Sequence, residues 1–92
     1  MTVVTLYTAE GCALCERALA VVRGVQGELG FELAVVDIDG VAELEARYRE
    51  LIPVVEIDGE RAFTYFVDAN ALRERVRPAV LSTKSGEPMA ES

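Results

Sequence analysis

The sequence predicts a small α/β domain with the element order β-α-β-α-β-β-α and a four-stranded mixed sheet. The length of 92 residues suits one core, and a hydrophobic fraction of 51% is enough to fill it. Short apolar runs alternate with longer segments that have helical periodicity. Near the end, Asp58-Gly59 is a strong signal for an antiparallel hairpin. We expect the domain to span residues 1–80 and a flexible tail to span residues 81–92.

The first half of the chain predicts a strand, a helix and a second strand. Residues 3–8 are β-branched or aromatic and end at a turn over residues 9–11. The next segment carries apolar residues at steps of three and four, namely Leu14, Ala18, Val21, Val22, Val25 and Leu29. Residues 31–38 are almost continuously apolar, a pattern typical of a strand covered on both faces. We therefore expect a buried second strand that runs parallel to the first.

The second half predicts a surface helix followed by the hairpin. Asp39 is suited to cap this helix, and Glu45 and Arg49 have the spacing of an ion pair on it. The apolar stripe consists of Val41, Leu44, Tyr48 and Leu51. Residues 54–57 and 62–66 then form the two hairpin strands.

A last helix is expected after Asp68, which is a good N-cap residue. The helix carries Leu72 and Val76 on its apolar face. Pro78 is expected to end it, because proline lacks the N–H that a helix interior requires.

Composition excludes several classes of function. The formal charge of -7 disfavours binding to nucleic acid or to an anionic membrane. The absence of histidine excludes Ser-His and Cys-His catalysis within the chain and any metal site with a histidine ligand. No apolar run approaches the roughly 18 residues of a membrane span, and the N-terminus lacks a secretory signal. We expect a cytoplasmic monomer.

The two cysteines form the candidate catalytic site. Cys12 and Cys15 follow the first strand and open the first helix. Free N–H groups and the positive end of the helix dipole favour a thiolate at Cys12, which is the candidate nucleophile. Cys15 falls on the inward stripe with Ala18 and Val22, so it is the candidate resolving thiol.

Three segments resemble glutaredoxin-like proteins of the thioredoxin superfamily: YTAEGCALC (7–15), VDID (36–39) and IPV (52–54). The resemblance covers about residues 2–77 and implies a thioredoxin/glutaredoxin-like fold. It further implies that Pro53 is a cis-proline facing the dithiol and that Ile52 presents its backbone to the substrate.

The match to glutaredoxins that use glutathione is incomplete. Ala9 stands at the usual lysine position, and Ala13-Leu14 replaces the familiar Pro-Tyr. The segment 63–66 stands where such proteins have Gly-Gly, and Asp68 is the substrate-binding residue that survives. Glutathione therefore remains open as a co-substrate, and the chemistry requires no cofactor.

Three other residues carry weaker signals. Arg17 is expected to be a solvated charge on the first helix, since exposed ion pairs contribute little. Tyr7 and Phe66 lie in predicted strands. An aromatic residue of a strand packs into the core more often than it lines a substrate groove.

The leading hypothesis is a thiol–disulfide oxidoreductase that acts in cell redox homeostasis. Its partners would be protein or low-molecular-weight disulfides and an external thiol reductant. One alternative is a redox-inactive binding module with the same fold. A less favoured one is a dimer whose Cys12 and Cys15 thiolates hold zinc or an iron–sulfur cluster.

Overall fold

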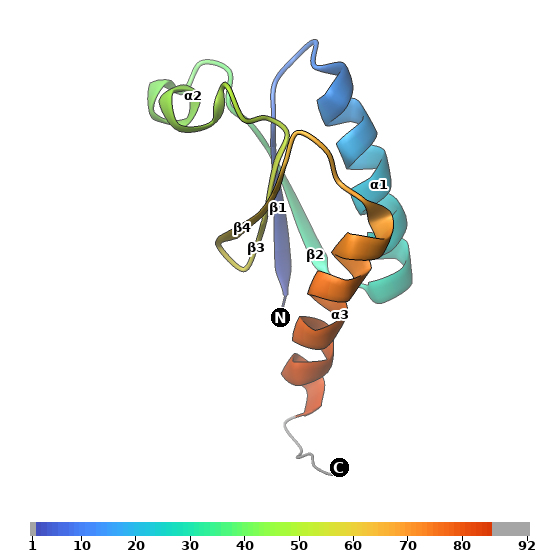
Figure 1. Cartoon of the computed structure of the whole chain (residues 1–92). Helices are drawn as coiled ribbons and strands as arrows, with labels where there is room; N and C mark the ends of the chain where they lie inside the picture. The colour runs from blue at the N-terminus through green and yellow to red at the C-terminus, as the bar shows by residue number, and fades with distance from the viewer. Residues whose placement is uncertain (1, 86–92) are drawn as a thin grey trace.

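Seven elements follow one another in the predicted order β-α-β-α-β-β-α (Figure 1). The computed structural model describes residues 2–85, and it describes the side chains of residues 2–77. The elements are β1 (Val3–Thr8), α1 (Ala13–Leu29), β2 (Glu32–Asp37), α2 (Ala42–Tyr48), β3 (Val54–Ile57), β4 (Glu60–Thr64) and α3 (Ala69–Ser85).

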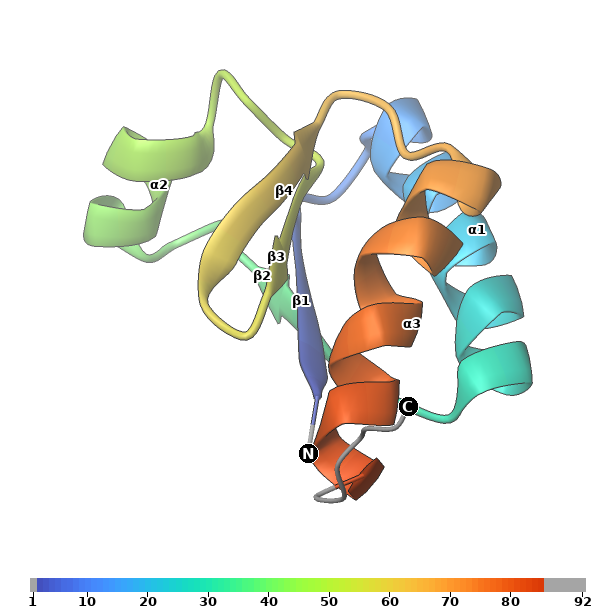
Figure 2. The same cartoon turned by 60° about the horizontal axis from the view of Figure 1, so that its bottom comes forward.

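The sheet has four strands in the order β2-β1-β3-β4 and is mixed, as predicted. Strand β2 is parallel to β1, whereas β3 is antiparallel to both β1 and β4. Helices α1 and α3 cover one face of the sheet, and α2 lies on the other side (Figure 2). The domain therefore has three layers, and β1 runs through the middle one.

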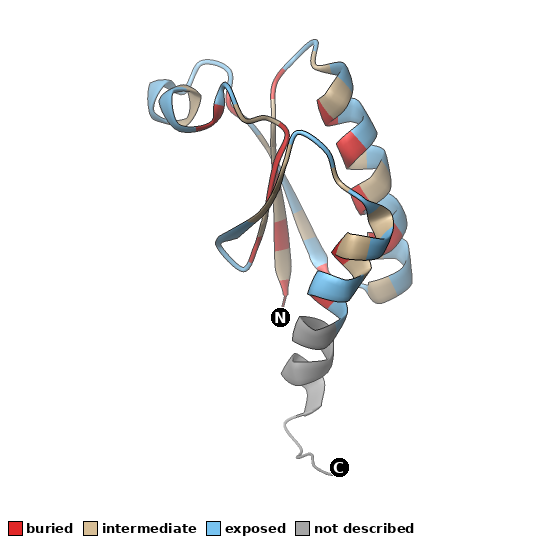
Figure 3. Ribbon diagram, in the orientation of Figure 1, coloured by how far each residue is buried: buried red, intermediate tan, exposed pale blue. Residues whose placement is uncertain are grey.

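Alternation along the strands divides the core into two clusters. Figure 3 shows where the buried positions lie along the strands and the helices. Successive side chains of a strand point to opposite faces, so Leu6 and Val55 pack toward α1 and α3 while Val54 packs toward α2. The larger cluster comprises Val4, Leu6, Ala18, Val22, Val25, Phe31, Val55, Ile57, Leu72 and Val76. The smaller cluster comprises Ala9, Ile38, Tyr48 and Val54.

Strand β2 is parallel to β1 as predicted, but the expectation that both of its faces are covered is wrong. It is an edge strand of the sheet, and Val35 is 43% exposed. The seven residues of α2 span only about 10 Å, against roughly 20 Å for a strand of six residues. A helix this short cannot cover the strand.

Helix α2 begins later than predicted, and the expected cap at Asp39 is wrong. The N-cap is Val41, and no side chain forms a capping hydrogen bond there. The predicted pair between Glu45 and Arg49 is present at 3.1 Å. Asp39 has other partners, which are described below.

The hairpin turn at Asp58 and Gly59 is confirmed. Their φ angles of 51° and 88° are both positive, as a type I′ turn requires. Strand β4 ends at Thr64 rather than at Phe66, because Tyr65 has a φ of 68° and leaves the extended conformation.

Asp68 caps α3 as predicted, since its Oδ2 accepts the N–H of Ala71 at 2.9 Å. The expected end of the helix at Pro78 is wrong, because α3 continues to Ser85. A proline removes a single N–H donor from the ladder, and the other residues still close the helical turns. Of the predicted tail, residues 81–85 belong to α3, and residues 86–92 lie outside the described residues.

Candidate dithiol site

Cys12 is the N-cap of α1, directly after the turn that follows β1. Its φ and ψ of -98° and 105° are extended, so its side chain can turn back over the first helical N–H groups. The N–H of Cys15 donates to Cys12 Sγ at 3.1 Å. The two cysteines are joined by a disulfide, with their Cα atoms 5.2 Å apart. The first turn of the helix thus directs a backbone donor at the Cys12 sulfur.

The two sulfurs differ in their access to solvent. Cys12 is half-buried, whereas Cys15 is only 2% exposed. Cys15 lies three residues before Ala18 and seven before Val22, on the face of α1 that packs against the sheet. An incoming molecule would therefore meet Cys12 first.

Pro53 lies at the same end of the sheet as the dithiol. In the β1–β3 ladder, Tyr7 pairs with Val54, so Pro53 comes beside the end of β1 that leads to Cys12. The Ile52–Pro53 peptide bond is cis, and Pro53 is buried. Ile52 is half-buried, and its N–H donates to the carbonyl of Tyr48 at 3.0 Å.

The turn after β4 is tied to the Pro53 loop at two points. The N–H of Tyr65 donates to the carbonyl of Pro53 at 2.9 Å, and its hydroxyl donates to the carbonyl of Glu50 at 2.8 Å. These bonds hold Tyr65 in the left-handed region, which is rarely occupied by an aromatic residue. The turn places Phe66 in solvent, where it is 70% exposed, so the prediction of a core position for Phe66 is wrong.

An apolar groove of about 220 Å³ lies between α1 and the segment that follows β4. Leu14, which lies between the two cysteines, is part of its wall, and Arg17 contributes a charged group. The complete lining is Leu14, Arg17, Ala18, Val21, Tyr65, Phe66 and Val67. For Phe66 the less favoured of its two expected roles, a place in a groove, is therefore the one that the structure shows. The sequence did not single out Tyr65, because this residue fits the pattern of the preceding strand.

Asp68 follows the groove at the start of α3. It is exposed, and its Oδ2 is occupied by the N–H of Ala71. Its capping bond fixes the beginning of α3 two residues after Phe66.

A cluster of two tyrosines and a carboxylate lies on the α2 side of the sheet. The rings of Tyr7 and Tyr48 are stacked with centroids 4.2 Å apart, so Tyr7 packs against its neighbours as predicted. Both hydroxyls donate to Glu56, at 3.4 Å from Tyr7 and 2.9 Å from Tyr48. Burial, followed by the hydrogen bond to Glu56, raises the pKa of Tyr48 to about 12. Tyr48 therefore stays neutral throughout the physiological range.

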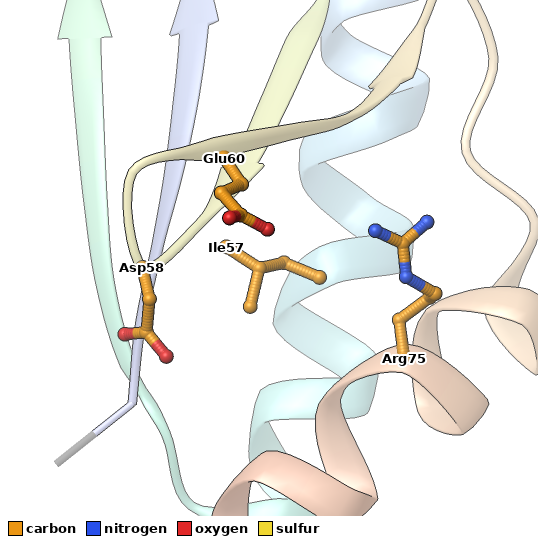
Figure 4. A pocket seen from close by; sticks show the side chains of 4 residues that line it. All are labelled: Ile57, Asp58, Glu60 and Arg75. Carbon is orange, nitrogen blue, oxygen red and sulfur yellow. The ribbon is translucent and has the colours of Figure 1, made fainter.

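A second cavity, of about 360 Å³, lies at the opposite end of the sheet (Figure 4). Arg75 of α3 lies across it from Asp58, in the hairpin turn, and from Glu60, at the start of β4. Ile57, its apolar member, pairs with Val4 near the start of β1, whereas Cys12 follows the end of that strand. This cavity is therefore separate from the dithiol.

Among residues 2–77, whose side chains are described, no three His, Cys, Asp or Glu side chains gather as ligands for a metal ion. None of the helices in residues 2–85 has the length and hydrophobicity that a membrane span requires.

Comparison with known families identifies the chain. The model of the glutaredoxin-like domain (DUF836) matches residues 3–77, a range that contains both cysteines, the Pro53 loop and Asp68. The chain belongs to the glutaredoxin-like domain family. An uncharacterized protein of Mycobacterium tuberculosis is 35% identical over 75 residues, which cover 76% of this chain and 77% of that protein. The resemblance seen in the sequence is thus confirmed.

Solved structures confirm the thioredoxin fold of this glutaredoxin-like chain. Protein Ne2328 of Nitrosomonas europaea is 32% identical, covers 80% of this chain and 89% of its own length, and has a TM-score of 0.69. Protein XcR50 of X. campestris is 28% identical over 82% of this chain and 96% of its own, with a TM-score of 0.69. Chloroplastic thioredoxin z, at 18% identity over 89% of this chain and 80% of its own, has a TM-score of 0.72 and shows the fold alone.

Proposed function

We propose that this glutaredoxin-like protein is a thiol–disulfide oxidoreductase that works through Cys12 and Cys15. One observation carries the proposal: Cys12 Sγ accepts the N–H of Cys15 at the start of α1, while the Cys15 side chain is buried beneath it. A donor N–H and the positive end of a helix stabilise a thiolate, which is the reactive form of cysteine. Burial of the second sulfur reserves it for an intramolecular step.

The reaction begins with the reduced dithiol. The Cys12 thiolate attacks one sulfur of a substrate disulfide, and the other substrate sulfur leaves as a thiolate. Cys15 then loses its proton and attacks Cys12 Sγ in the mixed disulfide. This second step releases the first substrate sulfur as a thiolate and forms the Cys12–Cys15 disulfide. Two electrons have passed to the substrate, and an external thiol reductant must return two to the protein.

The surroundings of the dithiol favour a protein disulfide over glutathione. The groove wall formed by Leu14, Val21 and Phe66 suits an apolar side chain close to the substrate cysteine. Glu10 and Glu16 are exposed on either side of the cysteines, and they would repel the carboxylates of glutathione.

The Pro53 loop supplies the backbone contact in this proposal. The N–H of Ile52 is used by Tyr48, so the Ile52 carbonyl is the group of its backbone left to pair with a bound chain. Asp68 would bind the substrate at the far end of the site, through the carboxylate oxygen that does not cap α3. We also propose a cytoplasmic location, where thiol pools can reduce the pair.

The test separates the two cysteines. Reduced Cys15→Ser is mixed with a disulfide-bonded protein, and mass spectrometry should find a stable mixed disulfide at position 12. Cys12→Ser, the matched control, should form no adduct and show no turnover. An adduct on Cys15 in the wild type, or equal turnover in the two variants, would contradict the mechanism. Capture of the same protein by the double Cys→Ser variant at unchanged affinity would support a binding module instead.

A further inference from the structure

Asp39 connects the two segments that flank the dithiol site. Its Oδ2 accepts the N–H of Glu10, in the turn before Cys12, at 3.0 Å. Its Oδ1 accepts a guanidinium N–H of Arg49, three residues before Ile52, also at 3.0 Å. One carboxylate thus holds the cysteine turn with one oxygen and the approach to the Pro53 loop with the other.

The backbone at Asp39 is held by two hydrogen bonds. Its own N–H donates to Asp37 Oδ1 at 2.8 Å, and the preceding residue, Ile38, donates to the carbonyl of Thr8 at 2.9 Å. The bond from Ile38 to Thr8 extends the pairing of β1 with β2 toward the cysteine turn. The carboxylate therefore projects from a backbone that is already anchored to the strand leading to Cys12.

The side chain of Arg49 is held in place by a second carboxylate. Its guanidinium contacts Glu45 at 3.1 Å as well as Asp39, and Glu45 Oε2 accepts the N–H of Gly40 at 2.8 Å. The Glu10 N–H, followed by the Arg49 guanidinium, holds the pKa of the Asp39 carboxyl below its ordinary value of 3.8. Both oxygens are thus available as acceptors at neutral pH.

We propose that Asp39 is a positioning residue, which fixes the turn before Cys12 relative to the Ile52–Pro53 loop through its bonds to Glu10 and Arg49. The proposal rests on the proposed function, since alignment matters only if a substrate must engage Cys12 and the Pro53 loop together. The exposed ion pair with Arg49 adds little to the stability of the fold by itself. Its role in the proposal is to fix the relative position of the two segments. Asp39 touches neither sulfur in this account.

The decisive comparison is between Asp39→Ala and Asp39→Asn. Both variants remove the same negative charge, so any effect of charge on the Cys12 thiolate is equal in the two. The asparagine carbonyl can still accept the N–H of Glu10, whereas alanine cannot. The control is Glu28→Gln, which disrupts a comparable exposed pair with Arg73 near the other end of α1.

Two readouts require no substrate. Hydrogen exchange at the Glu10 amide should be faster in Asp39→Ala than in Asp39→Asn, and unchanged in the Glu28→Gln control. In the pH profile of Cys12 alkylation by iodoacetamide, Asp39→Ala should react about two- to fivefold more slowly at neutral pH than Asp39→Asn, the size of a helix-end effect. Equal Glu10 exchange in the two Asp39 variants, or identical alkylation profiles, would overturn the proposal.

A third variant keeps the proposal testable if Asp39→Ala fails to fold. Arg49→Ala retains the hydrogen bond between Asp39 and Glu10 but removes the bond from Asp39 to the segment that leads to the Pro53 loop. Its Glu10 amide should exchange as in the wild type, while its reaction with a disulfide-bonded protein should slow about two- to fivefold. An unchanged rate would refute the link to the Pro53 loop. A wild type that exchanges no disulfides would refute the proposed function and leave the alkylation result to decide the role of Asp39.

Discussion

The hydroxyl of Tyr48 donates a 2.9 Å hydrogen bond to Glu56, which joins α2 to the centre of the sheet. Tyr48 is 2% exposed, and burial, followed by this bond, raises its pKa from 10.0 to about 12. The neutral hydroxyl is thus favoured in the folded state. The stability that it contributes is complete below about pH 10 and is lost as the pH rises through about 12.

We predict that the wild type loses this contribution between pH 10 and 12. Urea denaturation of the wild type and Tyr48→Phe at a series of pH values measures it. The difference between their free energies of unfolding should be constant from pH 7 to 9 and should shrink above pH 10. A difference that stays constant up to pH 12 would show that Tyr48 titrates as it does in the unfolded chain.

Gly24 within α1 and Gly30 at its C-cap should respond to alanine in opposite directions. Gly24 lies within the helix with open space around it, so Gly24→Ala should stabilise the protein by about 0.5–1 kcal/mol. Gly30 ends the helix with a φ of 77°, so Gly30→Ala should cost about 1–2 kcal/mol. Chemical denaturation measures both values. Changes of the same sign would be inconsistent with this account of the helix and its end.

Replacing Phe66 by alanine should separate substrate binding from folding. Because the side chain is 70% exposed, the free energy of unfolding should change by less than about 0.5 kcal/mol. Loss of an apolar contact in the groove should slow exchange with a protein disulfide by about tenfold. Exchange with a small, hydrophilic disulfide should change by less than about twofold, because such a molecule does not fill the groove.

The control for Phe66 is Val35→Ala, which removes apolar surface from the exposed edge strand β2. This variant should react with both substrates at the wild-type rate. Equal slowing by the two variants would mean that general surface hydrophobicity, rather than the groove, governs exchange.

The parts of the fold that depend on neighbouring residues were predictable from the sequence. The hairpin is encoded in Asp58 and Gly59, two residue types that tolerate a positive φ. The placement of Cys12 at a helix start and of Cys15 on the buried face follows from the spacing of apolar residues after the first strand. A few residues that are close together in the sequence determine each of these features.

The parts that depend on distant contacts were not predictable. The left-handed conformation of Tyr65 is held by the carbonyl of Pro53, and nothing in the local sequence requires it. Aspartate is a common helix-cap residue, yet the carboxylate of Asp39 accepts the N–H of Glu10, which lies 29 positions earlier in the chain. An apolar run such as that of β2 also does not reveal how much of the strand a helix will cover.

The division of the core into two unequal clusters has a consequence for the dynamics of the site. Ala9 and Val54, both in the smaller cluster, adjoin the cysteine turn and the Pro53 loop, respectively. Segments that bury few side chains open locally at a lower free energy than the rest of a domain. We therefore expect the α2 side to open locally at a lower free energy than α1, α3 and the larger cluster. Local opening of the α2 layer would then make the dithiol accessible to a bulky partner without unfolding of the whole domain.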